Sequence, residues 1–271
     1  MNWENLTAED FREFIKVSKG VAIIPYGCLE KHGYHLPLGT DMFIAKNLAE
    51  QACKIEEALV VPIAPYGIIS EATHTYGCLS ISSHLQYEIL EELCDELARN
   101  GYHKIIIING HGGGTNFLKY FAQSRLEKPH DYVVCIYNAH NRSEEQDQKF
   151  LAVNGPMDGS GHADVKESSE ICYLHPELVH LDRIDQSPEQ VYELGRLNNF
   201  ADVGLYSAIG WYADHPHHIA GNPIKATAEK GKILTDIYVE NLAKAIKAFK
   251  EDDMAIKLTK EFYSKRFNQE G

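Results

Sequence analysis

The chain has 271 residues, of which 44% are hydrophobic and 24% are charged, a composition typical of a globular protein. Its formal net charge of −13 disfavours nucleic acid as a partner, because an acidic surface repels phosphate backbones. The N-terminus lacks the features of a signal peptide, and the apolar stretches are too short to cross a bilayer. Six scattered cysteines without a CxxC pair indicate reduced thiols. We therefore expect a cytoplasmic protein that binds neither nucleic acid nor membranes.

Short apolar runs alternate with longer amphipathic stretches along the chain. We expect strands over residues 21–25, 59–64, 104–109 and 132–137, and helices over 41–56, 83–99, 115–126, 167–174 and 226–249. Because the strands are continuously apolar and alternate with helices, they predict an α/β fold with a mainly parallel sheet covered on both faces. The polar stretch 140–161 predicts a long loop.

The first group of metal-ligand side chains follows the first predicted strand. Glu30 and His32 are two residues apart, so an extended backbone would direct both side chains to the same side. Asp41 stands where a helix should begin, and a carboxylate there interacts favourably with the free N–H groups of the first turn. The plain alternative is that Asp41 only caps the helix and that His32 is a solvated loop residue.

A glycine-rich turn, residues 109–114, follows the strongest predicted strand and contains His111. Its glycines let the backbone approach a ligand closely, and ligands bind beyond the carboxyl ends of strands in open α/β sheets. The turn could instead cradle a phosphate. However, it lacks the Lys-Ser/Thr pair of a P-loop and the full spacing of a dinucleotide-binding motif. An ordinary turn with an incidental histidine is the remaining interpretation.

Two further segments carry side chains of the same kind. His162 precedes Glu167 by five residues at the predicted entrance to a helix, where both could simply cap the helix or face solvent. Ser70 and His74 follow the second predicted strand and are candidates for substrate contact. Taken together, carboxylates and imidazoles gathered after successive strands predict a metal site, because crowded carboxylates repel each other unless cations neutralise them. This mixed oxygen and nitrogen set suits Zn²⁺, Mn²⁺ or Fe²⁺.

Four motifs resemble those of the creatininase family, also called creatinine amidohydrolases. The family pattern E-x-H-G-x-H-L-P-L-G-T-D stands here at residues 30–41, and N-G-H-G-G stands at 109–113. H-A-G-x-x-E-T-S corresponds to residues 162–169, with Asp164 and Ser168 as departures, and G-x-P-x-x-A-T-A-E-K-G corresponds to 221–231. The resemblance implies one three-layer α/β/α domain over residues 1–271, with a mainly parallel central sheet.

The resemblance also implies a site for one or two divalent ions per chain, with Zn²⁺ favoured and Mn²⁺ or Fe²⁺ as alternatives. His162 falls on the family's catalytic histidine. The implied ligands are Glu30, Asp41, His111 and Glu167 for one ion, and His32 with a bridging Asp41 for the second.

Two departures from the family pattern bear on the substrate. Creatinine-cleaving members place a glutamate, a ligand of the second metal, two residues after the histidine of N-G-H. This chain has Gly113 there, so we expect a weakened second site, and we count Gly113 with Ser70 and His74 among the candidates for substrate contact. The tryptophans that close over creatinine are not evident near residues 154–162, so creatinine itself is a poor candidate.

The sequence thus predicts a metal-dependent hydrolase of a C–N amide bond in a small cyclic amide or formamide. Water activated by the metal would be the nucleophile and His162 the proton shuttle. The alternatives are a cofactor-maturation peptidase of the same family, a non-catalytic metal-binding scaffold, and an enzyme acting on sugars or phosphates. His162 beside a full ligand set disfavours the scaffold, and the acidic ligands disfavour a phosphate. Because creatininase relatives commonly form hexamers, the resemblance also predicts a homo-oligomer.

Overall fold

The structure, a computed structural model, describes residues 1–63, 65–155, 161–184, 200 and 202–268. Its four strands form one parallel sheet in the order β2-β1-β3-β4. These strands are β1 (Val21–Tyr26), β2 (Leu59–Val60), β3 (Lys104–Asn109) and β4 (Val133–Asn138). The predicted parallel sheet is therefore confirmed.

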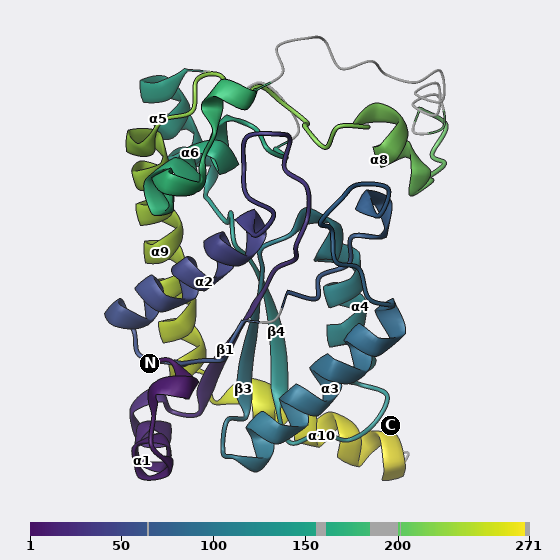
Figure 1. Ribbon diagram of the computed structural model, residues 1–271. Coiled ribbons are helices and arrows are strands. Elements are labelled where there is room, and N and C mark those ends of the chain that lie inside the picture. The colour runs from purple at the N-terminus through teal and green to yellow at the C-terminus, as the bar shows by residue number, and fades with distance from the viewer. Residues whose placement is uncertain (64, 156–160, 185–199, 201, 269–271) are drawn as a thin grey trace.

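Helices cover both faces of this sheet, so the predicted three-layer α/β/α architecture is also confirmed (Figure 1). One face carries α2 (Thr40–Ile55), α6 (Val165–Leu174) and α9 (Ala228–Glu251), and the other carries α3 (Ser83–Arg99) and α4 (Thr115–Ser124). The remaining described helices are α1 (Ala8–Ser18), α5 (Glu144–Asn154), α8 (Ile209–Asp214) and α10 (Met254–Asn268). Short 3-10 turns span Trp3–Asn5, Ser70–Ala72, Gly112–Gly114, Pro176–Leu178 and Leu181–Arg183.

Two hydrophobic cores lie on opposite faces of the sheet. Val21 and Ile23 of β1 pack with side chains of α2 and α9, whereas Ala22 and Ile24 pack with side chains of α3 and α4. Successive side chains of a strand point to opposite faces, and here both faces are covered. Burial on both sides explains why the strands are continuously apolar in sequence rather than alternating.

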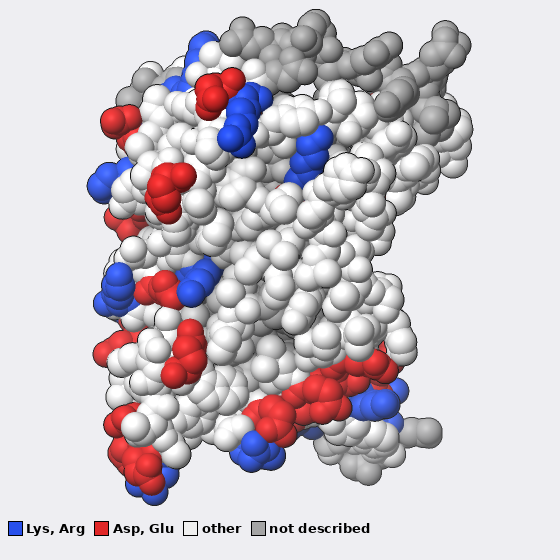
Figure 2. Space-filling model, viewed as in Figure 1, with Lys and Arg blue, Asp and Glu red and all other residues white. Residues whose placement is uncertain are grey.

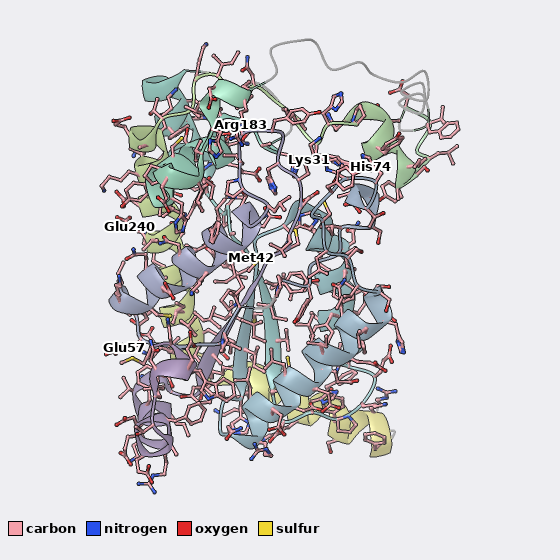
Figure 3. All side chains as sticks on the ribbon, in the orientation of Figure 1. Lys31, Met42, Glu57, His74, Arg183 and Glu240 are labelled. Carbon is pink, nitrogen blue, oxygen red and sulfur yellow. The ribbon has the colours of Figure 1, made fainter. Side chains whose placement is uncertain are left out.

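The carboxyl ends of the strands all point toward one edge of the sheet, where the loops after β1 and β3 meet the start of α2. Figure 3 labels Met42 in the first turn of α2 at this edge, with Lys31 and His74 on the loops above it. On the face of the molecule seen in Figure 2, acidic side chains gather along α3, whereas Lys and Arg side chains are scattered. No helix in the described part of the chain is long and apolar enough to cross a membrane.

The predicted loop over residues 140–161 is wrong in part, because it contains α5. A capping box starts this helix: the Ser143 hydroxyl accepts from the Gln146 backbone N–H, and the Gln146 side chain accepts from that of Ser143. The first six residues of the helix are polar and its four apolar residues, 150–153, are consecutive rather than helically spaced, so hydrophobic periodicity did not reveal it. Residues 156–160 of that prediction, and residue 64 of the second predicted strand, lie outside the described residues.

Helix α9 meets α6 at Gly231, where the two backbones come into contact. A Cβ atom added at Gly231 would lie 1.8 Å from the backbone oxygen of Ser169. The Thr227 N–H donates to the Ser169 hydroxyl at 3.1 Å, which fixes the start of α9 at the same place. Since α6 carries Glu167 in its first turn, this contact positions part of the site described below.

We expect Gly231→Ala to destabilise the protein by about 1–3 kcal/mol, because the added methyl group overlaps the α6 backbone. Replacing glycine by alanine inside a helix normally has the opposite effect and stabilises the protein by about 1 kcal/mol. Gly210→Ala in α8 is the control, since no atom lies within 4 Å of an added Cβ there. Urea unfolding of both variants measures the difference. A Gly231→Ala protein as stable as the Gly210→Ala protein would show that the contact is misplaced.

Candidate metal centre

Asp41 lies in the first turn of α2 and is only 2% exposed. Its Oδ1 is 3.2 Å from His32 Nε2, and its Oδ2 is 3.0 Å from His111 Nδ1. The carboxylate therefore presents one oxygen to each of two histidines. A carboxylate in this arrangement can bridge two metal ions.

Both histidines are oriented by backbone carbonyl groups. His32 Nδ1 lies 3.1 Å from the carbonyl oxygen of Glu30, and His111 Nε2 lies 2.9 Å from that of Ile68. A carbonyl only accepts, so in the neutral ring these nitrogens carry the proton. The opposite nitrogen of each ring then faces Asp41 with a free lone pair, as a metal ligand must.

The first ligand group lies on the His111 side of Asp41. Glu30 Oε2 is 3.1 Å from His111 Nδ1, and the Cys28 thiol lies 2.9 Å from Asp41 Oδ2. One ligand atom from each of these four buried residues lies within 4.8 Å of the other three. The donor set and its close spacing fit a divalent metal ion.

The second ligand group lies on the His32 side. Glu167 Oε2 is 3.6 Å from His32 Nε2, and it accepts a hydrogen bond from the Ala163 N–H at 2.6 Å. Asp164 caps α6 through its own carboxylate, which fixes the first turn that holds Glu167. The resemblance grouped Glu167 with Glu30 and His111, whereas in the structure Glu167 lies next to His32; which ion it binds stays a prediction. The start of α6 approaches the centre from the side of His32.

His162 lies beside the second group. Its ring centroid is 4.2 Å from that of His32, and its Nε2 is 3.0 Å from the carbonyl oxygen of Lys31. The Trp211 ring stands perpendicular to it, with the centroids 5.5 Å apart. His162 is 9% exposed, and its neighbours are the buried ligand candidate His32 and the aromatic ring of Trp211.

Sequence reasoning missed His218 and Trp211. His218 is fully buried, its Nδ1 lies 3.4 Å from Glu30 Oε1, and the Trp211 indole N–H points to that same nitrogen at 3.5 Å. The run of three histidines in residues 215–218 was the available signal. The family pattern places tryptophans near residues 154–162. In this chain α8 brings Trp211 to the site from a more distant part of the sequence.

The three candidates for substrate contact lie at different distances from the ligands. Ser70 is exposed in its short turn. The His74 ring lies 5.2 Å from the His218 ring, at the outer side of the site. A Cβ atom at Gly113 would lie 2.5 Å from His111 Nε2, so no side chain fits there while His111 keeps its position. The role of these three residues in substrate contact stays a prediction.

The buried charges of the centre shift each other's pKa. Burial opposes ionisation of Asp41, yet His32 and His111 hold its pKa well below the usual range. Burial also opposes a charge on His32, but Asp41 and Glu167 outweigh it and raise the pKa of His32 to about 10. Burial raises the pKa of Glu167 to about 7. Burial and the neighbouring His32 lower the pKa of His162 to about 4, so its ring is neutral at pH 7.

Comparison with known proteins places the whole arrangement in one family. The family model for creatininase, described as creatinine amidohydrolase, matches residues 4–246. The creatinine amidohydrolase of Pseudomonas putida is 23% identical over 89% of this chain and 94% of its own length. A mycofactocin precursor peptide peptidase of Mycobacterium ulcerans is 29% identical over 78% of each chain. A formylamino-pyrimidinone 5'-monophosphate deformylase of Methanobrevibacter ruminantium is 26% identical over 83% of this chain and 84% of its own.

Solved structures share the fold. A manganese form of creatininase superposes with a TM-score of 0.75 over 93% of this chain and 99% of its own, at 20% identity. A variant creatininase of the Zn-Zn type gives a TM-score of 0.76 over 93% of this chain and 98% of its own. With the family model matched across nearly the full length, the chain belongs to the creatininase family.

Proposed function

We propose that this chain is a metal-dependent hydrolase of the C–N amide bond in a small cyclic amide or formamide. The observation that carries the proposal is the position of Asp41 between two ligand groups, with the neutral His162 beside one of them. Relatives named for three different substrates support hydrolysis of a C–N bond as the shared reaction.

Each side of Asp41 would hold one divalent ion, with Zn²⁺ favoured and Mn²⁺ or Fe²⁺ as alternatives. Glu30 and His111 would complete the first position, and His32 and Glu167 the second. A divalent metal supplies a low-pKa water as nucleophile and polarises the substrate carbonyl group. The chain's own task is then to hold the substrate and to move protons.

His162 is the group that we assign to proton transfer. Its Nε2 faces the Lys31 carbonyl oxygen at 3.0 Å, so in the neutral ring Nε2 carries the proton and Nδ1 is the free acceptor. Nδ1 would accept a proton from the attacking water and pass it to the leaving nitrogen. Because the Lys31 carbonyl fixes the tautomer, the ring is oriented for this exchange before the substrate binds.

The aromatic side chains around His162 suit a flat substrate. The rings of Trp211, His218 and His74 lie near one another at the outer side of the ligands. Flat rings offer stacking surfaces for a planar amide. A small nitrogen-rich ring, or a formamide attached to one, could therefore stack on these aromatic side chains.

A peptidase acting during cofactor maturation is the second candidate. Mycofactocin precursor peptide peptidases are 28–29% identical to this chain, above the 23% of the creatinine amidohydrolase. Purified enzyme loaded with zinc or manganese should be assayed against cyclic amides, formamides and short peptides. The proposal predicts turnover of a cyclic amide or formamide, and turnover of peptides alone would favour the second candidate.

We expect His162→Ala to keep its metal and its fold but to lose turnover by about 10²- to 10⁴-fold, the usual effect of removing a positioned acid–base group. Glu167→Ala should lose both metal and turnover. Metal content, melting temperature and rate are measured on both variants. The assignment fails if His162→Ala stays fully active, or if it loses metal as completely as Glu167→Ala.

The raised pKa of His32 predicts a pH dependence of the chelator-treated protein. Its folded-state pKa of about 10 exceeds the unfolded value of about 6.5, so protonated His32 stabilises the fold at low pH. That contribution is lost as the pH rises from about 6.5 toward 10. We expect stability to fall by about 1–2 kcal/mol between pH 7 and 8.5, while zinc binding tightens because the ion displaces the proton.

Urea unfolding and zinc competition at both pH values test this prediction. His32→Asn should reduce the pH dependence of stability, and His84→Asn, which alters a histidine whose side chain is 83% exposed, should leave it unchanged. Equal pH dependence in all three proteins would contradict the proposed charge state of His32.

A further inference from the structure

Cys28 belongs to the first ligand group by position, but the function proposed so far uses only Glu30, Asp41 and His111 of that group. It is fully buried, two residues after the end of β1, and it packs against Ile69 and Ala72. Its backbone pairs with Tyr66 in an isolated bridge, and the Gly67 N–H donates to the Gly27 carbonyl at 2.9 Å. The backbone that carries the thiol is thus held against residues 66–67.

The Cys28 sulfur lies close to the oxygen atoms of Asp41 and Glu30 that would bind an ion on the His111 side of Asp41. Sγ lies 2.9 Å from Asp41 Oδ2 and 3.8 Å from Glu30 Oε2. His111 Nδ1 lies 3.0 and 3.1 Å from those two oxygens. Tetrahedral zinc with bonds of about 2.0 Å to N or O and about 2.3 Å to S has ligand–ligand distances of about 3.3–3.5 Å. The observed distances lie on both sides of these values, so small shifts would form a tetrahedral site.

Without Cys28 this ligand group has three members, the carboxylates of Glu30 and Asp41 and the imidazole of His111, and it lacks a third carboxylate. Residue 113 is a glycine, and the structure leaves no room for a side chain there because an added Cβ would contact His111 Nε2. The same Cβ would lie 2.9 Å from Glu71 Oε1, but Glu71 is not among the residues whose ligand atoms converge on Asp41. Within the described residues, Cys28 is the fourth member of that group.

We propose that Cys28 is a thiolate ligand of the ion held by Glu30, Asp41 and His111. On binding, the S–H bond breaks, the proton leaves to solvent, and a metal–sulfur bond forms. This inference rests on the metal-dependent function proposed above. It gives one of the two metal positions a soft sulfur ligand, whereas the other has only nitrogen and oxygen ligands. Thiolate ligation favours Zn²⁺ or Cd²⁺ over Mn²⁺ at this position.

Cobalt substitution tests the proposal through a readout that does not depend on activity. Wild-type protein loaded with Co²⁺ should show a thiolate-to-cobalt charge-transfer band in the near ultraviolet. Cys28→Ser should lose this band, and its affinity for Cd²⁺ should fall by at least about tenfold while its affinity for Mn²⁺ changes little. Cys78→Ser is the matched control, since Cys78 Sγ also lies near the site, 3.3 Å from the Lys31 N–H nitrogen, and the band should persist. Glu71→Gln should likewise keep it.

Bound cobalt without a charge-transfer band in the wild-type protein would overturn the inference and leave the proposed hydrolase intact, with Cys28 only donating a hydrogen bond to Asp41. A band that persists in Cys28→Ser would overturn it as well. Failure to bind cobalt at all would overturn both proposals. If Cys28→Ser does not fold, cadmium NMR of the wild-type chain decides, because sulfur ligation shifts the resonance strongly and the absence of that shift contradicts the inference.

Discussion

The burial of several carboxylates at one edge of the sheet is the constraint on which the rest of this structure depends. Glu30, Asp41 and Glu167 are at most 6% exposed, and burying uncompensated charges costs several kcal/mol per ion. Histidines placed between them, and the N-terminal ends of α2 and α6, provide positive charge at the same point. The contact of α9 with α6 and the loops after β1 and β3 hold these groups together. Divalent ions would complete the charge balance.

Much of this centre could be predicted from the sequence because its residues follow strand ends or begin helices. Asp41 and Glu167 both lie in first helical turns, and His111 follows the best-defined strand, as the local pattern indicated. The grouping of Glu167 with His32 could not be predicted, since it depends on the direction from which α6 approaches. Spacing along the chain carries no information about that direction.

Other features escaped prediction for different physical reasons. Trp211 and His218 come from a segment without hydrophobic periodicity, and only the tertiary fold brings it to the ligands. Helix α5 is set by its capping residues rather than by an apolar face. Cys28 is one of six scattered cysteines in the sequence, and only its distance to Asp41 distinguishes it from the others. For Trp211, His218 and Cys28 the missing information was a contact between distant segments, whereas for α5 it was a local capping box.

Family members with different named substrates raise the question of where specificity lies. In this chain the ligand groups are buried beneath a layer of aromatic side chains, and that layer includes Trp211. Gly113 and Cys28 alter one of the two ligand groups, whereas the aromatic layer lies around His162 beside the other. We therefore expect the metal centre to set the reaction and the aromatic layer to select the amide.

The most direct test of the account is the metal content of Asp41→Ala, compared with wild type after equilibration with zinc and measured by elemental analysis. Circular dichroism confirms that the variant is folded. If Asp41 joins two ion positions, the wild-type chain binds two ions and the variant loses most of both. Normal metal content in a folded Asp41→Ala protein would contradict the central claim.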